Sequence, residues 1–129
     1  MSRALRPIKE EWGEPVYLPH GTDVSCTSDI IMFIADQAGC SNEQSDSREC
    51  ITVYINEPVK FLEYLEYVSA PQLVDDFMED EGINVEDDQL FVERAEGLVG
   101  LVQGMQQNVP AWREFYDTLD DQLVIKVDW

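Results

Sequence analysis

The chain has 129 residues, of which 44% are aliphatic, aromatic or cysteine residues; a chain of this length can bury about two-thirds of its unfolded surface, and its apolar content excludes a disordered acidic tail. Its 8 Lys and Arg residues against 27 Asp and Glu residues give a net charge of −19. Because such a charge repels phosphate backbones and anionic lipids alike, we expect no direct binding to nucleic acid and no membrane partner.

The N-terminal residues differ from the rest of the chain in composition. Residues 1–13 hold three of the eight basic residues and few apolar ones, which predicts an N-terminal arm or lead-in, followed by a single domain over residues 14–129. The tripeptide at 16–18, between Pro15 and Pro19, predicts a short edge strand, since proline is tolerated beside edge strands.

The next segment has helical signals. Ser28 is a favourable N-cap and Asp29 suits a first turn, apolar residues follow at positions 30, 31, 33, 34 and 38, and Gly39 can end the helix in the left-handed conformation. We therefore predict a central helix here. Residues 41–49, SNEQSDSRE, have the polar composition typical of an exposed loop.

Two kinds of periodicity follow. Residues 50–56 alternate apolar and polar side chains, a period of two that predicts a half-buried strand. From Pro58 the apolar residues repeat at helical spacing, and Pro71 interrupts and restarts the pattern, so two consecutive short helices are predicted. Gly82 is the predicted end of the second one.

The C-terminal third predicts two further helices and a strand. The helix over residues 86–107 has an apolar stripe with spacings of four, three, four and three: Phe91, Ala95, Leu98, Val102 and Met105. Glycines at positions 97, 100 and 104 each lower its stability by about 1 kcal/mol relative to Ala, which suggests a close neighbour. A shorter helix is predicted from Pro110 to Leu119, and a final strand over residues 123–128.

The order of these elements predicts the fold class. One strand, a helix, a second strand, three or four helices and a last strand are typical of an α+β domain. We expect a single domain with a small, mainly antiparallel sheet packed against several helices. The chain shows no internal repeat.

The acidic residues are unevenly distributed. In the stretch from Asp75 to Asp88 eight of fourteen side chains are carboxylates, and no Lys or Arg occurs between Lys60 and Arg94. Residues 75, 76, 79 and 80 lie at i, i+1, i+4 and i+5, so a helix puts them on one side and the apolar residues 73, 74, 77 and 78 on the other. Concentrated like charge lowers stability by self-repulsion, which predicts a basic partner.

We predict that this partner is a basic protein and that it binds ten carboxylates. At 1.5 Å per residue the helical face carries roughly one charge per 2.5 Å, against about one per 1.7 Å along duplex DNA. Lys and Arg side chains that normally hold phosphates could therefore bind it. The predicted partner-binding residues are Glu63, Glu66, Asp75, Asp76, Glu79, Asp80, Glu81, Glu86, Asp87 and Asp88.

Other readings of the acidic stretch are a solvated face without a partner and a calcium loop. An EF-hand needs oxygen ligands at positions 1, 3 and 5 and Gly at 6, but placing Gly82 at 6 puts Phe77 at 1. His20, the only histidine, lies in a Pro-Gly turn, and no nucleotide-binding or metalloprotease motif is present. We therefore predict no catalytic residue, no metal and no cofactor.

Aromatic residues are a second source of partner contacts. Six of them are candidate interface anchors, although burial in the core is the simpler reading for most: Tyr54, Tyr64, Tyr67, Trp112, Tyr116 and Trp129. Glu63 and Glu66 beside Tyr64 and Tyr67 indicate that this helix has a solvated side, so at least one of these two rings should be exposed.

The cysteines and the N-terminus predict a compartment. Cys26, Cys40 and Cys50 are odd in number and form no CxxC pair, and residues 1–13 contain no apolar signal core. No apolar run approaches the roughly 20 residues needed to span a bilayer. We expect a cytoplasmic protein with reduced thiols.

Together these features predict a non-enzymatic acidic inhibitor that neutralises a basic nucleic-acid-acting protein, in particular an immunity protein against a nuclease toxin. The nearest alternative is a phage-type DNA mimic that blocks a restriction, CRISPR or DNA-binding protein. A third is a halophile-adapted protein of other function, although its acids should then be spread evenly. An enzyme would require carboxylates such as Glu93 or Glu96 to line a pocket.

Overall fold

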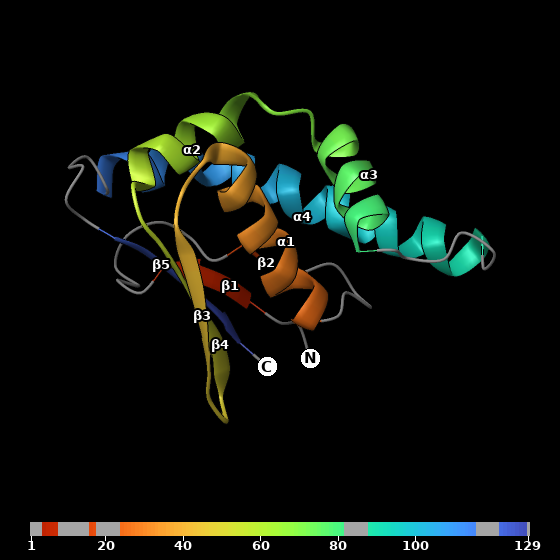
Figure 1. Ribbon diagram of the computed structural model, residues 1–129, viewed down its shortest axis with the longest axis horizontal. Coiled ribbons are helices and arrows are strands. Elements are labelled where there is room, and N and C mark those ends of the chain that lie inside the picture. The colour runs from red at the N-terminus through yellow and green to blue at the C-terminus, as the bar shows by residue number, and fades with distance from the viewer. Residues whose placement is uncertain (1–3, 8–15, 18–23, 82–87, 116–121, 129) are drawn as a thin grey trace.

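The protein is a small α+β domain, seen in a computed structural model that describes residues 4–7, 16–17, 24–81, 88–115 and 122–128 (Figure 1). Within these ranges the chain forms five strands and four helices. They are β1 (Ala4–Pro7), β2 (Val16–Tyr17), α1 (Val24–Ala38), β3 (Asn42–Asp46), β4 (Cys50–Ile55), α2 (Pro58–Tyr67), α3 (Ala70–Asp80), α4 (Asp88–Phe115) and β5 (Leu123–Asp128).

The five strands form one antiparallel sheet in the order β2-β1-β5-β4-β3. The last strand of the chain lies in the middle, where Val127 pairs with Leu5 on one side and with Ile51 on the other. All three side chains are buried. The predicted strands at residues 50–56 and 123–128 are confirmed, and β2 lies at the sheet edge as expected.

The segment predicted as an N-terminal arm contains a strand. Ala4–Pro7 forms β1, which pairs with β2 and with β5, and Leu5 is fully buried. For these four residues the expectation of an arm is wrong. The sequence did not predict this strand because four residues are too few to show an alternation of apolar and polar side chains. Its partner β5 also lies more than a hundred positions further along the chain.

The loop predicted over residues 41–49 is also corrected. Asn42–Asp46 forms β3, which pairs with β4 along its whole length, and the hairpin turn is closed by a 2.9 Å hydrogen bond from the Ser47 amide to the Cys50 carbonyl. No residue of β3 is buried. Polar and charged side chains are typical of edge strands, because they discourage further pairing, and this composition resembles that of a loop.

Helix α1 begins earlier than predicted and ends where expected. It starts at Val24, so Ser28 is not an N-cap but lies inside the helix, where it is 1% exposed. After Ala38, Gly39 adopts a φ of 79°, the left-handed conformation that closes a helix. The Lys60 ammonium donates to the Gly39 carbonyl at 3.4 Å, which satisfies a carbonyl at this end.

Helix α4 continues through Pro110, where we predicted that a new helix starts. Proline removes one backbone donor and normally kinks or ends a helix. Val109 and Trp112, on either side of it, are both fully buried, so packing holds the two parts of α4 against the same core. Leu98, Val102 and Met105 are buried as predicted, while the side chain of Phe91 lies outside the described residues.

The helices form two layers on one face of the sheet. Helix α1 contacts β3, β4 and β5, and α4 contacts β2, while α2 and α3 pack on α1 and α4. Figure 1 shows α2 and α3 on the side of the molecule away from the sheet. The predicted helices at Pro58 and Pro71 are confirmed as α2 and α3. The outer surface of the domain on this side is therefore formed by α2 and α3.

Candidate protein-binding site

Helix α3 separates its apolar and acidic residues as the sequence predicts. Leu73, Val74, Phe77 and Met78 are buried, and Phe77 meets Phe33 of α1 edge to face with ring centroids 5.5 Å apart. The opposite side carries exposed carboxylates, and Glu81 follows as the exposed C-cap. We call this surface the acidic face; it consists of Asp75, Asp76, Glu79, Asp80 and Glu81.

Part of the acidic face lies at the less favourable end of its helix. A helix macrodipole is negative at the C-terminus and disfavours carboxylates there by about 0.3 to 1 kcal/mol each. Glu79, Asp80 and Glu81 lie at this end, while the first turn of α3 holds no acid and the last turn no base. Among the described residues none forms an ion pair with the acidic face, and Asp76 accepts a hydrogen bond of 3.0 Å from Gln72.

The other predicted partner-binding residues differ in their surroundings. Glu63 on α2 is exposed. Glu66 contacts Arg113 of α4 at 2.5 Å, so its charge is already compensated within the domain. Glu86 and Asp87 lie outside the described residues, and Asp88 begins α4 with its side chain outside them. The structure thus brings together the five carboxylates of the acidic face, with Glu63 on the neighbouring helix.

Gln106 of α4 holds the junction between α2 and α3. Its side-chain amide donates to the carbonyl oxygens of Leu65 at 3.0 Å and Val68 at 2.7 Å, which would otherwise lack partners at the end of α2. Only Val68 and Ser69 separate the two helices. This anchoring residue was missed from the sequence, where a single glutamine in a long helix carries no signal.

A hollow of about 470 Å³ lies between the end of α1 and the outer side of α2. Five of its six lining residues belong to α2 or its C-cap and recur at helical spacing, so they share one side of the helix. We call it the tyrosine hollow; it is lined by Ala38, Lys60, Glu63, Tyr64, Tyr67 and Val68. Tyr67 is 79% exposed and Tyr64 half-buried, which confirms that at least one of the two rings faces solvent.

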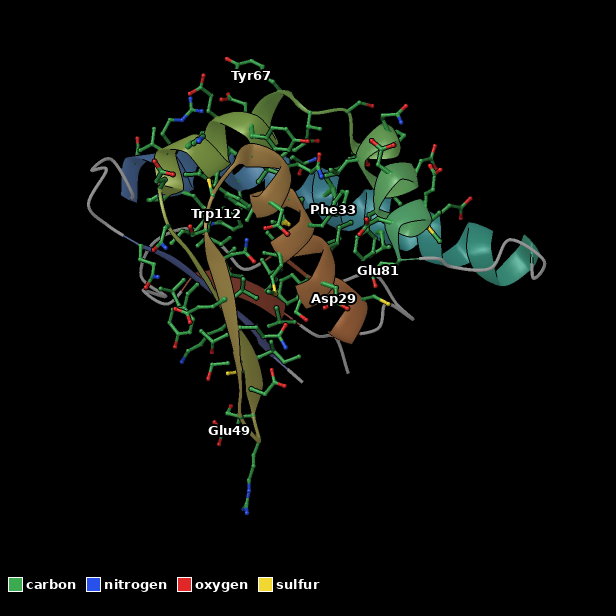
Figure 2. All side chains as sticks on the ribbon, viewed as in Figure 1. Asp29, Phe33, Glu49, Tyr67, Glu81 and Trp112 are labelled. Carbon is green, nitrogen blue, oxygen red and sulfur yellow. The ribbon has the colours of Figure 1, made fainter. Side chains whose placement is uncertain are left out.

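The tyrosine hollow adjoins the acidic face. Burial raises the pKa of the Tyr64 phenol, and the negative charge of Asp76 raises this pKa further. Asp76 is therefore close enough to Tyr64 to act on it electrostatically. In Figure 2, Tyr67 projects from α2 at the top of the molecule, and Glu81 lies beyond the far end of α3.

The remaining candidates lie elsewhere. Trp112 is fully buried and Tyr54 half-buried, whereas His20, Tyr116 and Trp129 lie outside the described residues. The three cysteines are not joined by disulfides. Within the described ranges no group of three or more His, Cys, Asp or Glu residues could hold a metal ion. No helix in that part of the chain has the length and apolarity to cross a membrane.

No protein-family model matches the chain, and comparisons with curated proteins and with solved structures find no match either. Its function must therefore be argued from the chemistry of the surface formed by α2 and α3.

Proposed function

We propose that this protein is a non-enzymatic inhibitor that binds a basic nucleic-acid-acting protein, as an immunity protein binds a nuclease toxin. The acidic face of α3 is the observation that supports this. Its five carboxylates are exposed and have no ion pair among the described residues, and three of them, Glu79, Asp80 and Glu81, lie at the negative end of their helix. A surface that lowers the stability of its own domain in this way is explained by a partner that supplies the missing positive charge.

The inhibitor would act by occupying the surface on which the partner holds phosphates. Lys and Arg side chains that bind phosphate also form charge-assisted hydrogen bonds with carboxylates. Opposite charge steers the encounter and can raise association rates toward about 10⁸ to 10⁹ M⁻¹s⁻¹ at low salt. Rapid capture suits a protein that must silence a nuclease before it reaches nucleic acid, and we expect it to act in the cytoplasm.

A DNA mimic of the phage type is the second candidate, because the carboxylates follow one another along a single helix in a phosphate-like row. It would use the same surface and differ only in its target, a restriction, CRISPR or DNA-binding protein. The halophile alternative makes a different prediction. A protein adapted to high salt should unfold when salt is removed, whereas an inhibitor should remain folded.

The test is capture of the partner from the native host at about 50 mM salt, followed by washes up to about 500 mM, because exposed charge pairs are screened over about 8 Å at physiological ionic strength. The Asp76→Lys/Asp80→Lys variant should not retain the partner. The matched control is Glu43→Lys/Glu49→Lys, which makes the same change in net charge on the exposed β3–β4 hairpin and should still bind.

The outcome decides between the candidates. A captured nuclease that is inactive in the complex supports the immunity function, and a captured restriction, CRISPR or repressor protein supports the mimic. Equal loss of capture by both variants would show that total charge, and not the acidic face, is recognised. Capture that persists unchanged through the salt wash would contradict the electrostatic account.

A further inference from the structure

The tyrosine hollow has the composition of an interface anchor. Binding hot spots are enriched in tyrosine and are surrounded by polar contacts that exclude water. Tyr67 leaves 79% of its surface in solvent, and Tyr64 forms part of the wall beside it. Ala38 and Val68 add apolar atoms to the lining. Two phenol rings beside a dense field of charge are suited to hold one side chain of a partner.

The charges around the hollow indicate which side chain this is. Glu63 lines it and forms no ion pair within the described part of the chain, and Asp76 acts on Tyr64 from α3. The one cation in the lining, Lys60, donates to the Gly39 carbonyl at 3.4 Å. Its ammonium therefore lies at the C-terminal end of α1, where the helix dipole attracts it. The two carboxylates, Glu63 and Asp76, outnumber this one ammonium, so the net charge around the hollow is negative.

A guanidinium group matches this combination better than the other side chains. It stacks on aromatic rings through cation–π contact, and its planar fork forms paired hydrogen bonds with a carboxylate. An ammonium ion offers the charge without the flat surface. An aliphatic side chain offers surface but leaves Glu63 without a partner.

We propose that the tyrosine hollow receives an arginine side chain of the basic partner and that this contact sets the dissociation rate, while the acidic face sets the association rate. The identity of the partner rests on the proposed function, whereas the chemistry of the hollow does not. Exposed charges act mainly on association, and packed contacts at the centre of an interface act mainly on dissociation.

The first test uses small probes and needs no partner. The ¹⁵N-labelled protein is titrated with n-butylguanidinium, n-butylammonium and the neutral n-butylurea, and amide chemical shifts are followed by NMR. We expect saturable shifts at Ala38, Glu63, Tyr64 and Tyr67 with n-butylguanidinium. Binding of n-butylammonium should be weaker, and n-butylurea should cause no comparable shift.

Three variants locate the probe. Tyr67→Ala should weaken n-butylguanidinium binding by about two- to fivefold, the effect of a cation–π contact at an exposed site. Glu63→Gln should weaken it by a similar factor. Glu79→Gln removes the same charge from the distal half of the acidic face and should leave binding unchanged. Tyr67 and Glu63 are exposed, so both variants should keep the parent spectrum elsewhere.

Three results would overturn the proposal. Equal binding of n-butylurea would mean that the hollow takes an apolar group. Shifts that do not saturate and spread over the acidic face would mean that the cations only screen its charge. If Glu79→Gln and Glu63→Gln weakened n-butylguanidinium binding equally, the hollow would not be the binding site. Since these titrations contain no partner, their failure is separate from failure of the capture experiment.

The kinetic division is tested with the captured partner by surface plasmon resonance. Tyr67→Ala should raise the dissociation rate and leave the association rate within about twofold, as expected for loss of a packed contact. Asp76→Lys/Asp80→Lys should lower the association rate. If both variants act on the association rate alone, the hollow is not the anchor.

Discussion

A Cβ atom placed on Gly104 of α4 would lie 2.9 Å from Cγ1 of Val16 on β2. Real Cβ atoms do not approach other atoms so closely, and Val16 is itself buried, with 5% exposed. The sequence suggested a close neighbour for the glycines of this helix, and at Gly104 that neighbour is the edge strand. Gly100, one turn earlier, is exposed. The two glycines should therefore respond in opposite ways to the same substitution.

We predict that Gly104→Ala lowers the free energy of unfolding by about 1 to 2 kcal/mol, because overpacking exceeds the gain in helix propensity. Gly100→Ala should raise it by up to about 1 kcal/mol, since only propensity changes. Urea denaturation measures both. Adding Val16→Ala to Gly104→Ala should recover part of the loss, and a double variant without any recovery would show that Val16 is not the obstacle.

Leu98 tests the packing of α4 against the core. Its side chain is fully buried, so Leu98→Ala should cost about 2 to 5 kcal/mol through lost transfer energy and cavity formation. Val99 is half-buried, and Val99→Ala should cost about 1 kcal/mol. Thermal unfolding measures both. The Leu98→Ala variant should still capture the partner at temperatures where it is folded. A variant that melts like the parent but fails to bind would show that the interface lies on α4.

Asp80→Lys should stabilise the protein. The residue ends α3, where the helix dipole favours a cation, and the expected gain is about 0.3 to 1 kcal/mol at low salt. Asp75→Lys makes the same charge change in the middle of the helix and should raise the free energy of unfolding by less. Both gains should shrink between about 20 and 500 mM salt, because screening weakens them. An equal gain for both variants in urea denaturation would show that general repulsion, and not the dipole, is relieved.

Tyr64 should contribute to alkaline destabilisation. Burial, followed by the charge of Asp76, raises the pKa of its phenol in the folded protein. Between the unfolded and the folded pKa the folded state holds more protons, so stability falls as pH rises above about 10. Tyr64→Phe should make this fall shallower, and Asp76→Asn should do so less, since burial is the larger cause. Urea denaturation midpoints measured from pH 8 to 11 test both variants. If the midpoint fell equally steeply with pH in the parent and in Tyr64→Phe, this account would be contradicted.

Cys40 should be the least reactive thiol. It is buried, whereas Cys26 and Cys50 are half-buried, and burial followed by the charge of Glu57 raises the pKa of the Cys40 thiol. Because the thiolate is the reactive form, we expect Cys40 to be alkylated by iodoacetamide at least about tenfold more slowly than the other two. Peptide mass spectrometry of timed samples measures this. Comparable rates at all three would mean that the end of α1 opens readily.

Local periodicity alone determined several parts of this protein. The alternation in residues 50–56, the apolar stripes around Pro58 and Pro71, and the two faces of α3 were all predicted correctly, because a residue's burial in these elements depends on neighbours two to four positions away. The exposed carboxylates of α3 follow from the same rule. The amino-acid sequence was sufficient wherever one element must separate apolar from polar side chains.

Other features of the protein depend on contacts between residues far apart in the sequence, and only the tertiary structure shows them. β1 is a strand because the distant β5 pairs with it, and α4 passes through Pro110 because Val109 and Trp112 are buried on either side of it. Arg113 neutralises Glu66 from 47 positions away. The tyrosine hollow exists because α1 ends beside α2. A backbone pairing or a salt bridge across the fold leaves no period in the sequence, so only packing could establish which carboxylates remain available to a partner.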